Sequence, residues 1–180
     1  MPARSAGPEI TVCWRLRTSW RAESLLGRVA RHVAAAEGFA RGQLSVVVVA
    51  ERAMSTLHAR YGHNPESTDV LAFDLGTDRR RGLLDGEIVI CAAVARQRCR
   101  AQLGPGARDL LKHARAELAL YLTHGLLHLA GYDDHAPRAY RRMHAREDEL
   151  LTELGLGPVF AAAAAPAAVR TSRSRRPVGA

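Results

Sequence analysis

The sequence LTHGLLHLAGYDDH occupies residues 122–135 and holds two histidines four positions apart, His124 and His128. On an α-helix this spacing puts both imidazoles on one face about one turn apart, so a single metal ion can contact both. Gly131 stands where a left-handed residue commonly ends a helix. The apolar residues before it predict a long central helix over residues 107–130.

The loop directly after Gly131 offers a third metal ligand. Asp133, Asp134 and His135 supply oxygen and nitrogen donors. Two or three neutral imidazoles with at most one carboxylate suit Zn²⁺, and three protein ligands leave a fourth position for water, as catalytic zinc requires. The segment therefore predicts one zinc ion bound by the two helical histidines and a residue of this loop.

The residue after the first histidine argues against one zinc chemistry. Zinc proteases of the H-E-x-x-H type need a glutamate there as general base, and this chain has Gly125. Peptide hydrolysis is therefore not expected. Zinc also makes a bound water more acidic and polarises phosphoryl oxygens, so hydrolysis of a phosphodiester remains chemically open.

Strand and helix patterns alternate on the N-terminal side of this segment. Alternating or β-branched apolar runs predict strands, and apolar residues three or four apart predict helices. The predicted strands are residues 9–16, 44–50, 68–75 and 86–91; the predicted helices are one with Ser19 as N-cap, 51–61, 107–130 and 137–154. They predict an α/β (α+β) fold in which a small four-stranded mixed sheet packs against helices, the central one carrying the histidines.

One folded domain is expected from 180 residues. We expect a flexible N-terminus at residues 1–8, the domain at 9–155 and a disordered tail at 156–180. Residues 161–180 read AAAAAPAAVRTSRSRRPVGA, a low-complexity sequence that does not favour a packed core.

Composition narrows the class of protein. The net charge of +8 favours polyanions such as RNA, although a solvated surface gives the same balance. No apolar run approaches the ~20 residues of a membrane span, and the first residues do not look like an export signal, so we expect a cytoplasmic protein. Cys13, Cys91 and Cys99 form no C-x-x-C pair and are predicted to be reduced core thiols.

With these motifs, the sequence resembles the YbeY-type endoribonucleases, bacterial rRNA maturation factors with the signature H-G-x-L-H-L-x-G-Y-D-H. Residues 124–135 are similar to that signature, and TDVLAFDL at 68–75 and GEIVIC at 86–91 resemble the family in the same order. The likeness covers about residues 9–155. It implies a small α/β fold, one zinc ion bound by three side chains, and cleavage of single-stranded RNA. The implied partners are rRNA, near the 3′ end of the small-subunit molecule, and the small ribosomal subunit with its assembly and quality-control factors.

The sequence departs from the family at the third ligand. The family has a histidine directly after G-Y-D, and that position holds Asp134 here. The distance from this position to Met143 and Glu147 matches the family, which favours Asp134 as the ligand by register. His135 is the alternative ligand. It would take this place if the loop carried a one-residue insertion relative to the family.

A second departure precedes residue 68. The family usually has an arginine directly after a tyrosine, thought to engage phosphate, whereas Tyr61 is followed here by Gly62. Arg60, on the other side of Tyr61, is the candidate substitute because a guanidinium contacts a phosphate bidentately.

Other polar residues have two interpretations each. Asp69 either orients a ligand histidine or satisfies the backbone where a strand begins. The run Arg79, Arg80 and Arg81 is either a solvated turn or a contact for RNA phosphates. The isolated histidines are assigned no role: His58, His63, His113 and His144.

Three functions follow from these residues and from the resemblance. The first is a zinc-dependent endoribonuclease acting on rRNA. The second is a ribosome-assembly factor that binds RNA and holds zinc mainly for structure, which Gly62 and Asp134 favour. The third is a metalloprotease, which Gly125 disfavours.

Overall fold

The computed structural model describes residues 7–61, 67–104 and 107–160. Four strands alternate with helices along these segments. The elements in chain order are β1 (Glu9–Trp14), α1 (Glu23–Ala36), β2 (Arg41–Val49), α2 (Glu51–Tyr61), β3 (Val70–Asp74), the 3₁₀ turn η1 (Arg79–Arg81), β4 (Leu83–Cys91), α3 (Ala92–Leu103), α4 (Leu110–Leu129) and α5 (Pro137–Glu153).

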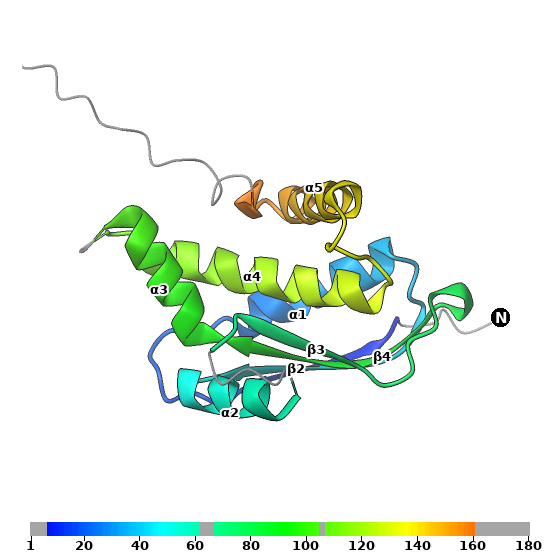
Figure 1. Cartoon of the computed structure of the whole chain (residues 1–180), viewed down its shortest axis with the longest axis horizontal. Coiled ribbons are helices and arrows are strands. Elements are labelled where there is room, and N and C mark those ends of the chain that lie inside the picture. The colour runs from blue at the N-terminus through cyan, green and yellow to red at the C-terminus, as the bar shows by residue number, and fades with distance from the viewer. Residues whose placement is uncertain (1–6, 62–66, 105–106, 161–180) are drawn as a thin grey trace, which may run out of the picture.

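The strands form one mixed sheet in the order β1-β2-β4-β3. The first three pair in parallel, and β3 pairs antiparallel with β4. Helices α1 and α4 cover one face, α2 lies on the other, and α5 packs on the side of α4 away from the sheet (Figure 1). The predicted α/β architecture with a four-stranded mixed sheet is confirmed.

Helix α4 lies between the sheet and α5 and is the central element of the core. Its leucines at 118, 122, 126 and 127 have no solvent exposure. A helix that is apolar on nearly all sides is stable only when neighbours surround it. Here those neighbours are the sheet, α1, α3 and α5. The predicted central helix is confirmed, and Gly131 follows it with a left-handed φ of 86°.

Gly125 sets how closely α4 approaches the sheet. A Cβ on this glycine would stand 3.2 Å from two carbons of Ile88 and 3.4 Å from a carbon of Val70. The position is buried, so a larger side chain must push the side chains of Ile88 and Val70 aside. The residue that argues against protease chemistry is therefore also a packing requirement.

The structure differs from the predicted elements in three places. Helix α3 was not predicted, because its buried residues are the small Ala92, Ala95 and Cys99, which give a weak periodic signal. The predicted N-cap Ser19 is wrong: α1 begins at Glu23, without a side-chain cap. The other helix and strand boundaries differ from the predicted ones by a few residues. Apolar spacing locates an element, but backbone hydrogen bonds determine where it begins and ends.

The folded chain also continues past the predicted domain end at residue 155. Val159 is buried, Phe160 packs against the core, and the Phe160 backbone N–H donates to Asp148 Oδ1 at 2.9 Å. The prediction of disorder is therefore wrong for residues 156–160, because apolar side chains there find a partly open core surface. The rest of the predicted tail, 161–180, and most of the predicted flexible N-terminus, 1–6, lie outside the described residues.

All three cysteines are free, with Cys91 and Cys99 buried and Cys13 half-buried. Burial raises the pKa of the Cys99 thiol to about 11, so this thiol is inert at neutral pH. Within the described ranges, none of the helices combines the length and apolar character that crossing a membrane requires.

Replacing Gly125 by glutamate tests the packing constraint on α4. Gly125→Glu places a charged side chain against Ile88 and Val70, where overpacking and an unpaired buried carboxylate both cost free energy. We expect the free energy of unfolding to fall by at least about 3 kcal/mol, measured by urea denaturation. Ala145→Glu, at an exposed position of α5, is the control and is expected to change it by less than about 0.5 kcal/mol. Equal stabilities of the two variants would contradict the constraint.

Candidate metal site

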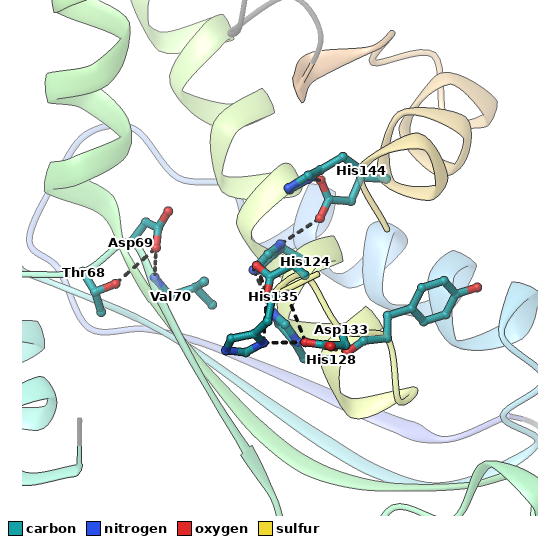
Figure 2. A network of polar contacts seen from close by, with 11 residues as sticks. Thr68, Asp69, Val70, His124, His128, Asp133, His135 and His144 are labelled. Carbon is teal, nitrogen blue, oxygen red and sulfur yellow. Dashed lines mark hydrogen bonds and ion pairs between the residues drawn. The ribbon is translucent and has the colours of Figure 1, made fainter. Parts of the chain in front are cut away.

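Three side chains converge where α4 ends. The Nε2 atoms of His124 and His128 lie 3.0 Å apart, and Asp134 Oδ2 lies 3.9 Å from the first and 4.0 Å from the second. Ligands about 2.0–2.2 Å from a tetrahedral zinc stand roughly 3.3–3.6 Å apart, so a small movement of these groups would let them share one ion. Figure 2 shows the two rings directed toward one another beside the loop that follows them.

The other nitrogen of each ring fixes its tautomer. His124 Nδ1 lies 2.8 Å from the carboxylate oxygen Oε1 of Glu147, and His128 Nδ1 lies 3.2 Å from the backbone carbonyl oxygen of Tyr132. Both partners only accept hydrogen bonds, so each Nδ1 carries the proton and donates. The lone pairs of the neutral rings are then left on the two Nε2 atoms.

Two lone pairs facing each other at 3.0 Å repel unless a cation or a proton lies between them. Burial lowers the pKa of His124, but the hydrogen bond and charge of Glu147, with the charge of Asp134, raise it to a net value above the ordinary one. Burial and the neighbouring charge of His124 lower the pKa of His128. A shared proton is thus the alternative to a metal ion, and the donor set fits a metal ion.

The loop after α4 turns Asp134, rather than His135, toward the histidines. His135 is 89% exposed; its Nδ1 lies 2.5 Å from Asp133 Oδ1, to which its backbone N–H also donates. Asp134 is only 29% exposed and contacts both rings. The geometry therefore agrees with the register argument for Asp134, and leaves His135 as a ligand only if the loop rearranges.

Glu147 is the site residue whose contact the sequence analysis did not anticipate. It enters from α5, its side chain is fully buried, and its carboxylate holds His124 in the orientation described above. A carboxylate that orients a ligand histidine in this way is a regular part of protein metal sites. The signal was present in the sequence, because Glu147 occupies the apolar face of an amphipathic helix, where an acidic residue needs a partner.

A second buried carboxylate holds the turn that carries the Tyr132 carbonyl. Glu37, at the end of α1, accepts from Arg79 Nη2 at 2.6 Å and from Arg146 Nε at 2.9 Å. Arg79 also donates to the carbonyl oxygen of Ala130 at 3.4 Å and stacks over the Tyr132 ring. The 3₁₀ turn, α1 and α5 are thereby fastened to the residues that end α4.

The arginines that the sequence singles out have different surroundings in the structure. Arg79 is engaged with Glu37 and the end of α4, which gives it a structural role. Arg80 and Arg81 are exposed, and Arg81 pairs with Asp78 at 3.4 Å. Arg60 stacks over Tyr61 at the end of α2, on the sheet face opposite α4 (Figure 1). Gly62, the position of the family arginine, lies outside the described residues.

Asp69 lies directly before β3, and the hydrogen bonds of its side chain are to its neighbours in the chain. Its Oδ1 accepts from the Val70 backbone N–H at 2.9 Å and from the Thr68 hydroxyl at 3.3 Å. Of its two predicted roles, the backbone one agrees with these contacts. Its charge nonetheless contributes to the raised pKa of His124.

Comparisons with known proteins identify the family and agree with the fold. The family described as Endoribonuclease YbeY matches residues 15–155. Proteins named Endoribonuclease YbeY from Thermobifida fusca and Bordetella avium are 38% and 34% identical over 139 and 151 residues; the matches cover 72% and 82% of this chain and 83% of each relative. The relative from Acidothermus cellulolyticus is 38% identical over 122 residues, covering 61% of this chain and 69% of that protein.

A solved structure supports the architecture independently. The solution structure of TM1509 from Thermotoga maritima superposes with a TM-score of 0.54 at 21% identity, covering 84% of this chain and 95% of that one. At this identity the likeness concerns the fold alone. The family match over most of the domain, with relatives at 38% and 34% identity, establishes that this chain belongs to the Endoribonuclease YbeY family.

Proposed function

We propose that this protein is a zinc-dependent endoribonuclease that cuts single-stranded rRNA, with His124, His128 and Asp134 holding one zinc ion. The observation that carries the proposal is the pair of Nε2 lone pairs turned toward each other beside a carboxylate. Membership of a family whose relatives are named endoribonucleases supplies the reaction class. By resemblance, the 3′ end of small-subunit rRNA is the proposed target.

The donor set favours zinc over other metals. Two neutral imidazoles and one carboxylate suit Zn²⁺, whereas magnesium and calcium favour oxygen ligands. The three side chains are between 23% and 31% exposed. That exposure supports a site open to a bound substrate, unlike a closed structural zinc site.

The chain's own groups have distinct parts in the proposed reaction. When bound, the zinc ion would supply an acidic water and a Lewis acid for a phosphoryl oxygen. Glu147 and the Tyr132 carbonyl keep each ligand ring in the tautomer that presents Nε2. Asp134 brings a negative charge, which makes a metal-bound water less acidic than three neutral histidines would.

The proposed RNA contacts come from the arginine run that precedes β4. Arg80 and Arg81 are exposed and are proposed to contact phosphates, whereas Arg79, also exposed, is already paired with Glu37. Arg60 is the remaining candidate for the missing family arginine, although its helix α2 lies on the sheet face opposite α4 (Figure 1). The small ribosomal subunit and its assembly factors are the proposed partners, and the cytoplasm the proposed location.

An assembly factor with a mainly structural zinc ion is the second candidate. Gly62 in place of the family arginine favours it. Without a guanidinium beside the scissile phosphate, the transition state for RNA cleavage would lose about 3–4 kcal/mol of stabilisation, and cleavage would be slow. The partial exposure of the three ligand side chains, which leaves access for a substrate, favours the nuclease instead.

Alanine substitutions of the two loop residues test the third ligand. Asp134→Ala is expected to lose bound zinc and RNA cleavage, because only two ligands remain. His135→Ala, the matched control, is expected to keep both. Zinc per chain is measured by mass spectrometry, with cleavage of a single-stranded rRNA fragment alongside. Metal loss in His135→Ala with retention in Asp134→Ala would reverse the assignment.

Substrate trials separate the candidate functions. We expect the zinc-loaded protein to cut the single-stranded RNA, to lose that activity in chelator, and to leave casein intact, since Gly125 provides no general base for peptide hydrolysis. Co-sedimentation with small ribosomal subunits, with zinc bound but no cleavage of any RNA offered, would refute the nuclease and favour the assembly factor.

A further inference from the structure

His144 on α5 is a buried histidine that contacts Glu147, the residue that orients the metal ligand His124. Its Nδ1 lies 2.6 Å from Glu147 Oε2, and it is 8% exposed. Its ring stacks on Phe160 with centroids 3.7 Å apart and planes 2° apart, while Tyr140 meets it edge-on at 4.1 Å. Figure 2 shows it on the side of the His124 ring away from Asp69.

The Glu147 carboxylate is shared between two imidazoles. Oε1 accepts from His124 at 2.8 Å, and Oε2 accepts from His144 at 2.6 Å. Because the carboxylate is fully buried, water does not replace a lost partner. With His144 absent, one oxygen would be unpaired in an apolar setting, and the carboxylate would gain by rotating away from its present plane.

We propose that His144 is a positioning residue for the metal centre. Its hydrogen bond fixes the plane of the Glu147 carboxylate. That carboxylate accepts the Nδ1 proton of His124, so the Nε2 lone pair of His124 is available to the metal ion. The inference rests on the metal site proposed above and extends it by one residue. Phe160 and Tyr140 keep the His144 ring in place, so the segment that follows α5 also contributes to the metal centre.

Two other interpretations of His144 fit the contacts less well. His124, His144 and Glu147 bring donor atoms close enough together to suggest a second metal site. Both Nδ1 atoms already donate to Glu147, at 2.8 and 2.6 Å, so neither nitrogen has a free lone pair for an ion. If His144 served only as core packing, phenylalanine would replace it without effect on the metal.

Two substitutions at this position separate hydrogen bonding from packing. His144→Phe keeps an aromatic ring against Phe160 and removes the donor to Glu147. His144→Gln removes the ring and keeps an N–H donor. His32→Phe is the matched control, because His32 pairs with the half-exposed Glu153 on the surface rather than with a residue of the metal site.

Zinc affinity, measured by competition with a chromophoric chelator, is the first readout, and the visible spectrum of the cobalt-substituted protein is the second. We expect His144→Phe to weaken zinc binding about tenfold, at the lower end of the effect of outer partners, and to shift the cobalt bands. His144→Gln is expected to stay within about threefold of the wild type, and His32→Phe to match it. Wild-type affinity and cobalt spectrum in His144→Phe would overturn the proposal.

NMR of the unmodified protein tests the same inference if a variant fails to fold. Long-range ¹H–¹⁵N spectra of the histidine rings should show a protonated, hydrogen-bonded Nδ1 on both His124 and His144. An unprotonated Nδ1 on His144 would overturn the inference. If the wild type binds zinc and cuts RNA but the His144 results are negative, only this inference fails; if the wild type binds no zinc, the proposed function fails as well.

Discussion

The two imidazole nitrogens held 3.0 Å apart at the end of α4 are the constraint on which the site depends. Each ring donates its Nδ1 proton outward, to Glu147 and to the Tyr132 carbonyl, so both lone pairs point inward. Such an arrangement is stable only with a cation or a proton between the rings. The surrounding fold supplies the rigidity: α4 is enclosed on nearly all sides, and Gly125 lets it lie directly against β4.

Two buried carboxylates, Glu37 and Glu147, connect distant parts of the chain to this pair of rings. Glu37 joins Arg79 of the 3₁₀ turn and Arg146 of α5 at the end of α1, and Glu147 joins α5 to α4. Leaving a buried charge without a partner costs about 3–5 kcal/mol, so each carboxylate strongly favours the one arrangement that pairs it. The metal site is therefore positioned by electrostatics between elements as well as by packing of the core.

Much of this arrangement was predictable from local patterns. The His124–His128 spacing and Gly131 predict α4 and its end, and apolar spacing predicts α5. Helix α3 escaped prediction because alanine and cysteine fill its buried face. The partnership of Glu37 with Arg79 joins residues on different elements, and nothing in local spacing indicates it. His144 looks like an isolated histidine in sequence, since its role depends on Phe160, in a segment expected to be disordered, and on how Glu147 is shared.

X-ray absorption at the zinc edge of the purified protein is the sharpest test of the metal site, because it counts the atoms around the metal. We expect four nitrogen and oxygen ligands at about 2.0–2.2 Å, with the outer-shell scattering of two imidazoles, from His124 and His128. Scattering from three imidazoles would place His135 rather than Asp134 on the metal. Sulfur ligands, or no bound zinc, would contradict the site altogether.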